Sequence, residues 1–366
     1  MLRAEELSVG YGKKVVVSGV SFEVKAGEVI SIIGPNGAGK STILKTIASQ
    51  LPLLGGKVHI GENIISEMSE KELSRKMSLM LTERINSEMM TCYDIAATGR
   101  YPYTGMFGIL EKEDRDIVEE AMSLTGISYL RDVDFRNISD GQRQCVMLAR
   151  AIAQEPEVML LDEPTSFLDI DHKLELLTLL RKLARGKQIA VVMTIHELDL
   201  AQRFSDKVLC IRDAKADKYG TPELVFSGSY INELYDIKNG TFEPLYGSSE
   251  PERVEGAPDV FVIGGGGCGI PVYHKLQREG IPFAAGIIHE NDLDYPLAKH
   301  LAADLVSERA YEPISEQNYN KALEIMRVCS KVIFCTEKTG TMNQKNLLLK
   351  ETAEKEGKEI ILPHEI

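Results

Sequence analysis

The sequence feature that most limits how this chain can fold is a glycine-rich segment near its start. Residues 34–41 read Gly-Pro-Asn-Gly-Ala-Gly-Lys-Ser and match the pattern G-x-x-x-x-G-K-[ST] at every specified position. An apolar run, 29–33, precedes the segment, and apolar residues at helical spacing follow it over 41–49. Strand, loop and helix in this order are the context in which the pattern cradles phosphates. We therefore predict an ATP-binding loop rather than an ordinary glycine-rich turn.

The residues of this loop have distinct expected roles. Glycines let backbone N–H groups turn toward phosphate oxygens, and the N-terminus of the following helix adds its positive dipole end. Lys40 is expected to reach the β- and γ-phosphates, and the Ser41 hydroxyl is expected to bind Mg²⁺. The predicted nucleotide-binding residues of the loop are Gly34, Pro35, Asn36, Gly37, Ala38, Gly39, Lys40, Ser41 and Thr42.

Two later apolar runs end in residues that suit ATP hydrolysis. Asp162 and Glu163 follow the run 158–161, and His196 follows the run 189–195. Because α/β sheets bind ligands at the carboxyl ends of their strands, we expect these side chains near the loop. We predict that Asp162 binds Mg²⁺, Glu163 accepts a proton from the attacking water, and His196 contacts the γ-phosphate. Alone, an acidic pair is an ordinary loop start and a single histidine is more often structural, but the phosphate loop favours catalysis.

The rest of the pattern predicts two α/β domains. Short alternating runs near the start indicate a β-rich part, and helical patterns dominate 71–153, which indicates a helical insertion. Apolar runs separated by helical stretches then favour a parallel sheet. Residues 242–258 lose periodicity and gain Pro, Gly, Ser and Glu. We predict that they form a linker between a domain at 1–241 and a smaller α/β domain at 259–366.

Composition limits where such a chain can act. The formal net charge of −13 argues against a nucleic-acid partner, because non-specific nucleic-acid binders need a basic surface. The six cysteines are scattered without a C-x-x-C pair and are expected to be reduced thiols. Residues 1–9 carry charges where a signal peptide is apolar, and the apolar runs fall short of the roughly 20 residues that span a bilayer. We expect a cytoplasmic protein that reaches the membrane only through a partner.

With these motifs in place, residues 1–239 resemble the ATP-binding subunit of ABC transporters. Residues 138–142, Ile-Ser-Asp-Gly-Gln, are similar to the signature sequence of that family, usually L-S-G-G-Q, and 166–169 are similar to its D-loop. His196 matches the switch histidine, and Tyr11 stands where the family places a ring that stacks on adenine. The resemblance implies a P-loop NTPase with a mixed-sheet core, a β-rich N-terminal part and a helical subdomain.

The resemblance also implies a shared active site. In this family two subunits enclose two ATP molecules, so a homodimer or a pair of ATPase subunits is expected. Ser139, Gly141 and Gln142 would contact the nucleotide held by the partner, and Asp169 of the D-loop would contribute to nucleotide binding. A plain helix N-cap is the alternative interpretation of 139–142, and both interpretations can hold at once.

Two positions depart from the family pattern. Asp140 replaces the first glycine of the signature and puts a carboxylate near a polyphosphate, unless its side chain points away or caps the helix. Thr82, with Glu83 next, stands where the family has the Q-loop glutamine that links Mg²⁺ to the membrane subunit. We expect slower turnover from Asp140, and we assign Thr82 to the magnesium site only by position.

The segment 97–103 indicates which class of transporter this chain resembles. It reads Ala-Thr-Gly-Arg-Tyr-Pro-Tyr and resembles the G-R-x-P-[YWH] segment of importers for iron-siderophore complexes, haem and cobalamin. A solvent-exposed proline turn is the alternative. The resemblance implies integral membrane permease subunits and an extracytoplasmic substrate-binding protein as partners. A soluble ABC-type ATPase that is not coupled to a permease is the alternative function.

The C-terminal domain carries a second glycine run. Gly264, Gly266 and Gly269 satisfy G-x-G-x-x-G after an apolar run, and Glu290 and Asp292 lie near where a ribose-binding acid would be. The domain is expected to be Rossmann-like, and it resembles domains appended to some cobalamin-type importer ATPases. A regulatory nucleotide or metabolite site and a mainly structural or docking role are both open. An oxidoreductase is a third interpretation, but no hydride-transfer residue can be identified.

Overall fold

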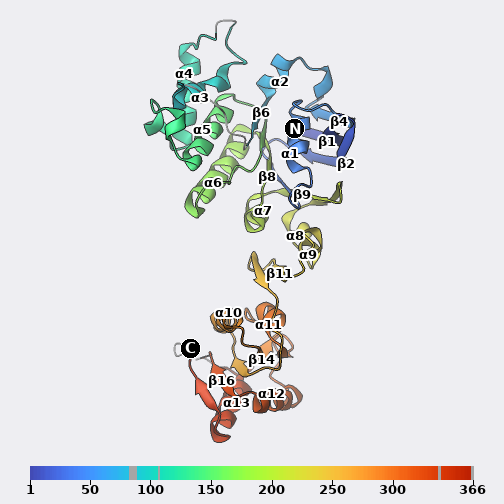
Figure 1. The fold of residues 1–366 in the computed structure, drawn as a ribbon, viewed down its shortest axis with the longest axis vertical. Coiled ribbons are helices and arrows are strands. Elements are labelled where there is room, and N and C mark those ends of the chain that lie inside the picture. Colours follow the sequence, from blue (N-terminus) through green and yellow to red (C-terminus); the bar gives the residue numbers. More distant parts are fainter. Residues whose placement is uncertain (82–88, 106–107, 337–338, 364–366) are drawn as a thin grey trace. The chain divides into compact units, whose positions relative to one another are not determined.

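Contacts divide the computed structural model into two units, Met1–Asp236 and Ile237–Ile366, called unit 1 and unit 2 below (Figure 1). The structure describes residues 1–81, 89–105, 108–336 and 339–363. Among these residues, no helix combines the length and apolar character that a membrane crossing requires.

Unit 1 opens with the predicted β-rich part. β1 (Leu2–Tyr11) pairs antiparallel with β2 (Lys14–Val24) and with β4 (Gly55–Ile60), which in turn pairs with β5 (Asn63–Ile64). Gly12, at a φ of 59°, makes the tight turn between β1 and β2. Leu2 and Ala4 of β1 are buried, as the alternation of apolar and polar residues predicts.

Parallel strands form the centre of unit 1. They lie in the order β9-β3-β8-β7-β6, and β10 joins them to β2 in one ten-stranded sheet. Every residue of β3, β7 and β8 is buried, as expected of strands covered on both faces. The bounds are β3 (Val29–Ile33), β6 (Met77–Met80), β7 (Val158–Leu161), β8 (Ala190–Thr194), β9 (Lys207–Arg212) and β10 (Lys215–Gly220).

A helical part stands beside this sheet. Figure 1 shows α3, α4 and α5 gathered on the side of unit 1 away from β1, β2 and β4. The prediction of a helical insertion over 71–153 missed β6, whose four residues pair with β7 and are too few to show a period. The described helices of unit 1 are α1 (Lys40–Ile47), α2 (Glu70–Lys76), α3 (Cys92–Ala97), α4 (Lys112–Leu124), α5 (Asp140–Ala153), α6 (Ile170–Lys187), α7 (Leu198–Phe204), α8 (Pro222–Val225) and α9 (Tyr230–Leu234), with 3-10 turns at Ile65–Glu67, Thr98–Arg100, Ser128–Leu130 and Phe135–Asn137.

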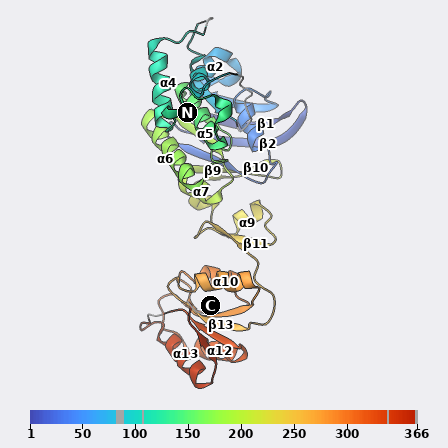
Figure 2. The ribbon, with the colours of Figure 1, turned by 60° about the vertical axis from the view of Figure 1, so that its left-hand side comes forward.

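Unit 2 contains the predicted smaller α/β fold. Its five parallel strands lie in the order β15-β14-β13-β16-β17. Val262 of β13 packs in the cluster that includes α10 and α11, whereas Phe261 and Ile263 pack with α12 and α13. Figure 2 shows α10 on one side of β13 and α12 and α13 on the other, the layering of a Rossmann-like fold. The bounds are β13 (Val260–Ile263), α10 (Ile270–Glu279), β14 (Phe283–His289), α11 (Tyr295–Leu301), β15 (Asp304–Glu308), α12 (Glu316–Val328), β16 (Lys331–Phe334), α13 (Gln344–Lys355) and β17 (Glu359–Ile361).

The segment predicted as a linker, 242–258, carries secondary structure. β11 (Gly240–Glu243) and β12 (Ser248–Pro251) form an antiparallel hairpin that belongs to unit 2. A Glu250 carboxylate oxygen lies 3.0 Å from His274 Nε2 of α10, and the Pro251 carbonyl accepts from His300 Nε2 of α11 at 2.9 Å. These contacts join residues far apart in the sequence, so loss of periodicity alone could not reveal them.

Candidate nucleotide site

The phosphate loop has glycines where a side chain would collide with its neighbours. Gly34 and Gly39 adopt φ values of 149° and 95°. A Cβ on Gly34 would lie 2.3 Å from the Ile211 carbonyl oxygen, and one on Gly39 would lie 2.4 Å from Val17 Cγ2. α1 begins at Lys40, so the first N–H groups of this helix face the loop. The predicted loop therefore has the backbone that a phosphate cradle needs.

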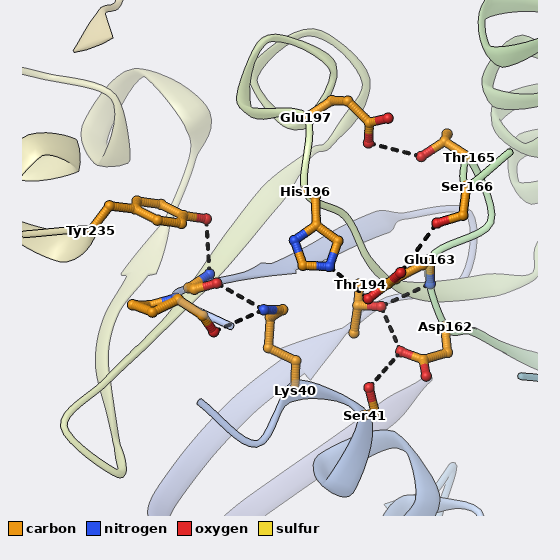
Figure 3. Close-up of polar contacts among 12 residues, drawn as sticks. Lys40, Ser41, Asp162, Glu163, Thr165, Ser166, Thr194, His196, Glu197 and Tyr235 are labelled. Atoms are coloured by element: carbon orange, nitrogen blue, oxygen red, sulfur yellow. Dashed lines mark hydrogen bonds and ion pairs between the residues drawn. The ribbon is translucent and has the colours of Figure 1, made fainter. Parts of the chain in front are cut away.

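Lys40 folds back over this loop. Its side chain is buried, and Nζ donates to the carbonyl oxygens of Gly34 at 2.7 Å and Pro35 at 3.1 Å (Figure 3). Burial lowers the pKa of Lys40, while the negative charges of Glu163 and Asp162 act to raise it. A cation is thus held at the mouth of the loop, where phosphate oxygens would take over from the carbonyl partners.

Ser41 and Asp162 provide oxygen ligands of the kind that Mg²⁺ prefers. Ser41 Oγ donates to Asp162 Oδ1 at 2.9 Å, and the Asp162 carboxylate is buried at the end of β7. The described residues include no group of three or more His, Cys, Asp or Glu that could hold a metal. Mg²⁺ in nucleotide sites needs no such group, because phosphates and water supply most of its ligands. The pair therefore fits a magnesium-nucleotide site.

The Glu163 carboxylate is held from two sides. His196 Nε2 lies 2.6 Å from Glu163 Oε1, and Ser166 Oγ donates to Glu163 Oε2 at 3.1 Å. Figure 3 shows this carboxylate and His196 facing the space beside Lys40. The structure thus brings the predicted base and the predicted γ-phosphate ligand together at the edge of the sheet where the phosphate loop lies.

The signature segment caps α5. Ser139 Oγ accepts from the Gln142 N–H at 3.2 Å, and Gln142 Oε1 accepts from the Ser139 N–H at 2.9 Å, which is a capping box. Asp140 pairs with Arg143 over 2.9 Å, so the carboxylate that raised concern in the sequence has a cation beside it. Ser139, Gly141 and Asp169 line a cavity of about 660 Å³.

Three further predicted positions have different outcomes. The hydroxyls of Tyr11 and Thr42 lie 3.4 Å apart, which places the half-exposed Tyr11 ring beside the phosphate loop. Asp169 caps α6, where its carboxylate accepts from the His172 N–H at 2.9 Å. Thr82 lies outside the described residues.

Comparisons with known proteins identify the family. The family described as ABC transporter matches residues 17–166. An uncharacterised ABC transporter ATP-binding protein of Methanocaldococcus jannaschii, MJ0873, is 46% identical over 290 residues, which cover 78% of this chain and 99% of that protein. The chain belongs to the ATP-binding subunits of ABC transporters. It is an ABC ATPase.

Two further relatives and one solved structure are similar to this ABC subunit. The ferric enterobactin transport protein FepC of Escherichia coli is 36% identical, over 65% of this chain and 88% of FepC. The cobalamin import protein BtuD of Halobacterium salinarum is 32% identical, over 80% of this chain and 75% of BtuD. An inward-facing ABC transporter of the metal-chelate type matches with a TM-score of 0.56 and 25% identity, over 64% of this chain and 88% of the other. In unit 2, the MJ0874 family matches residues 283–365.

The structure adds contacts that the sequence did not reveal in the site of this ABC subunit. Thr194, Gln144 and Tyr235 bond the backbone of the site, and Ser166 bonds the Glu163 carboxylate. Thr194 had a readable signal, a polar residue at the carboxyl end of an apolar strand. Gln144 and Tyr235 had none, because they reach the site from elements distant in sequence.

The glycine run of unit 2 is already filled by carboxylates of the chain. Asp294 accepts from the N–H groups of Gly265 at 2.6 Å and Gly269 at 2.9 Å, and Asp292 accepts from the Gly266 N–H at 2.8 Å. The Asp294 side chain is fully buried, and this burial raises its pKa although the glycine N–H groups act to lower it. A pyrophosphate would need these same N–H groups. The glycine run therefore does not fit a dinucleotide. The Asp292 carboxylate bonds the backbone of this run and is not available to bind a ribose hydroxyl.

Proposed function

We propose that this ABC subunit energises the import of iron chelates or cobalamin through a membrane permease, as a dimer that hydrolyses ATP with Mg²⁺. The observation that carries the proposal is the meeting of Lys40, Asp162 and Glu163 at one edge of the sheet (Figure 3). The roles of relatives in ferric enterobactin transport and cobalamin import support the substrate class.

The roles of the site residues follow from their chemistry. Lys40 would neutralise charge on the β- and γ-phosphates, and Ser41 and Asp162 would hold Mg²⁺, which adds positive charge there. Glu163 would take a proton from the water that attacks the γ-phosphorus as the bond to the bridging oxygen breaks. His196, 2.6 Å from Glu163, would orient that carboxylate and reach the γ-phosphate.

We expect a dimer because the N-terminus of α5 carries the signature-like segment, where an anion held by another chain would bind. Ser139 and Gly141 at this helix N-terminus line a cavity, and a helix N-terminus favours negative charge. Phe167 beside this cavity is 70% exposed, which suits burial against a second copy.

The Glu163→Gln variant tests the catalytic part of the proposal. An amide cannot take the proton, so turnover should fall by about a hundredfold or more while ATP still binds. Because bound ATP would then persist, sedimentation with ATP and Mg²⁺ should show a dimer, and Glu163→Gln combined with Lys40→Ala should stay monomeric. Undiminished turnover in Glu163→Gln would remove Glu163 as the base.

A groove of about 800 Å³ in unit 1 is the proposed permease contact. It lies between the sheet and the helical part and is lined by Gln50, Leu73, Leu79, Thr98, Tyr101 and Met147 among others. Tyr101 belongs to the segment that resembles importers, and this residue is 58% exposed. A permease seated here would keep the subunit on the inner face of the membrane.

Membrane fractionation separates this proposal from a soluble ATPase without a permease. The tagged chain, expressed in the organism from which it comes, should sediment with the membrane fraction. The Tyr101→Glu variant should appear in the supernatant and still bind ATP. Leu224→Glu changes an exposed residue outside the groove and should leave sedimentation unchanged. If the unchanged chain stays in the supernatant, the soluble alternative is favoured.

A further inference from the structure

Glu163 has an unusual backbone conformation for the residue that is proposed to act as base. Its φ is 48°, in the left-handed region that residues with a Cβ seldom adopt. Such a conformation persists only where the surroundings hold it, and it is common at active sites. The contacts that hold the peptide groups of Glu163 therefore determine where its carboxylate lies.

Thr194 holds the N–H side of Glu163. It is the last residue of β8, next to β7 in the sheet, and its side chain is fully buried. Its Oγ1 accepts from the Glu163 N–H at 2.8 Å and donates to Asp162 Oδ1 at 2.7 Å (Figure 3). A hydroxyl has one donor and two acceptor positions, so it can make both bonds at once. One side chain thus fixes the two neighbouring acidic residues relative to each other.

Gln144 bonds the carbonyl side of Glu163 from α5, and the Ser166 N–H donates to the same carbonyl oxygen at 3.1 Å. Gln144 lies in the second turn of α5, with its side chain largely buried, and its Nε2 donates to the Glu163 carbonyl oxygen at 3.0 Å. The same helix begins with the signature segment at the Ser139 N-cap. The helix that is expected to face the partner's nucleotide therefore also holds the base of its own chain.

We infer that Thr194 and Gln144 are positioning residues that together fix the backbone of Glu163 for ATP hydrolysis. Between them they bond the N–H and the C=O of this one residue, so the carboxylate keeps its place between His196 and Ser166. The inference rests on the proposed role of Glu163 as the base. Neither side chain needs to touch the nucleotide.

The two positions allow substitutions that remove a hydrogen bond and keep the shape. Thr194→Val removes the hydroxyl at nearly constant volume, and Thr194→Ser restores it. Gln144→Met keeps a long unbranched side chain without an amide donor. Ser205→Ala is the matched control, because it removes another buried hydroxyl of unit 1, one that donates to Ser31 Oγ at 2.6 Å.

Steady-state kinetics of the full chain, with ATP affinity measured separately, test the inference. We expect Thr194→Val and Gln144→Met to lower kcat by about tenfold to a hundredfold, since small misplacements of a reacting group cost that much. KM for ATP should change less than about threefold, because the phosphate loop is untouched. Thr194→Ser should recover most of the turnover, and Ser205→Ala should keep it.

Magnesium titration distinguishes the two residues. Thr194 also bonds Asp162, so Thr194→Val should raise the Mg²⁺ concentration needed for half-maximal turnover, whereas Gln144→Met should not. If Thr194→Val or Gln144→Met keeps kcat within about twofold, or loses only ATP affinity, the substituted residue is not a positioning residue for Glu163. A kcat loss as large in Ser205→Ala would assign the effects to general loss of packing.

The Glu163→Gln variant keeps this result separate from the proposed function. If Glu163→Gln is inactive while Thr194→Val and Gln144→Met are fully active, the positioning inference fails and the base assignment stands. If Glu163→Gln is fully active, the base assignment fails and the positioning inference fails with it.

Discussion

The Tyr235 hydroxyl accepts a hydrogen bond from the backbone N–H of Gly34 over 3.1 Å (Figure 3). Gly34 opens the phosphate loop, and Tyr235 follows α9 at the end of unit 1, one residue before the Asp236 boundary. Burial raises the pKa of Tyr235 to about 12, so the phenol stays neutral at physiological pH. The start of the nucleotide loop is therefore tied to the segment that leads into unit 2.

Replacing Tyr235 by Phe should weaken the phosphate loop. The substitution leaves the Gly34 N–H without its acceptor, which costs about 1–2 kcal/mol when the donor stays buried. ATP affinity should fall by about threefold to tenfold, measured by calorimetry, and urea unfolding should show the loss of stability. Tyr230→Phe removes a hydroxyl that bonds Asp217 instead and should keep ATP affinity. Equal ATP affinities for Tyr235→Phe and the unchanged chain would contradict the expected support.

Lys40→Ala should strongly weaken nucleotide binding by the whole chain. Hydrogen bonds to a charged group are worth about 1.5–3 kcal/mol, so affinity at the loop should fall by about tenfold to a hundredfold. No weaker site should remain, because Asp292 and Asp294 occupy the glycine N–H groups in unit 2. Equilibrium dialysis with labelled ATP measures binding at the phosphate loop, and dialysis with labelled NAD measures any binding at the glycine run of unit 2. Lys71→Ala, on an exposed position of α2, is the control. Saturable NAD binding by the Lys40→Ala variant would contradict the account of the glycine run.

Glu308 should make unit 2 sensitive to acid. Burial acts to raise the pKa of Glu308, but hydrogen bonds from the Ser315 N–H, the Asn318 amide and the Arg309 N–H lower it from 4.5 to about 2. A lowered pKa in the folded state contributes stability above the unfolded value, and this stability is lost as the pH falls. Unit 2 should thus lose stability between about pH 4.5 and pH 2.

Thermal unfolding at several pH values checks the role of Glu308. Glu308→Gln should be less stable than the unchanged chain at pH 6. The difference should shrink as the pH falls toward 2, because the carboxyl becomes protonated first in the unfolded state and then increasingly in the folded state. Glu312→Gln, at an exposed position, should follow the unchanged chain throughout. A stability difference that is independent of pH would show that the charge of Glu308 is not what matters.

Much of the nucleotide site could be predicted because strand order fixes it. Asp162 and His196 each follow a buried strand that lies in one parallel sheet, so their chain positions alone put them at the edge where the loop lies. The contacts of Gln144 and Tyr235 could not be predicted, since they depend on how α5 and α9 pack. Side chains at such distances in sequence leave no periodic signal.

Two features of unit 2 could not be decided from the sequence, for a similar physical reason. The pattern G-x-G-x-x-G reports backbone freedom, but it does not report which anion fills the cradle, and here Asp294 does. Most of the hairpin β11–β12 lies in the segment predicted as a linker, because Gly, Pro and Glu suppress periodicity there, although partners such as His274 hold the hairpin in place. Composition shows which backbone conformations a segment can adopt, whereas its contacts with the rest of the fold determine which conformation it does adopt.

Arg100 should stabilise the helical part, because it is buried there and does not lie on the surface of an exposed turn. Its guanidinium is buried, bonds Asp114 at 2.9 Å and the Ala153 carbonyl at 2.9 Å, and lies over the Tyr103 ring. Arg100→Met leaves the buried Asp114 carboxylate without a cation, which should cost about 3–5 kcal/mol in urea unfolding. In the double variant with Asp114→Leu, part of this loss of stability should be recovered, because the only carboxylate then left without Arg100 is Glu155, whose side chain is 43% exposed.

A second arginine of the helical part provides the comparison for Arg100. Arg131 pairs with Glu119 at 2.8 Å and Asp132 at 2.7 Å, but all three side chains are exposed, so Arg131→Met should cost less than about 1 kcal/mol. Hydrogen exchange should show that Arg100→Met loosens α4 and α5 before the central sheet, since the lost bonds lie in the helical part. If Arg100→Met and Arg131→Met destabilise the chain equally, burial does not make the Arg100–Asp114 pair more important for stability than an exposed pair.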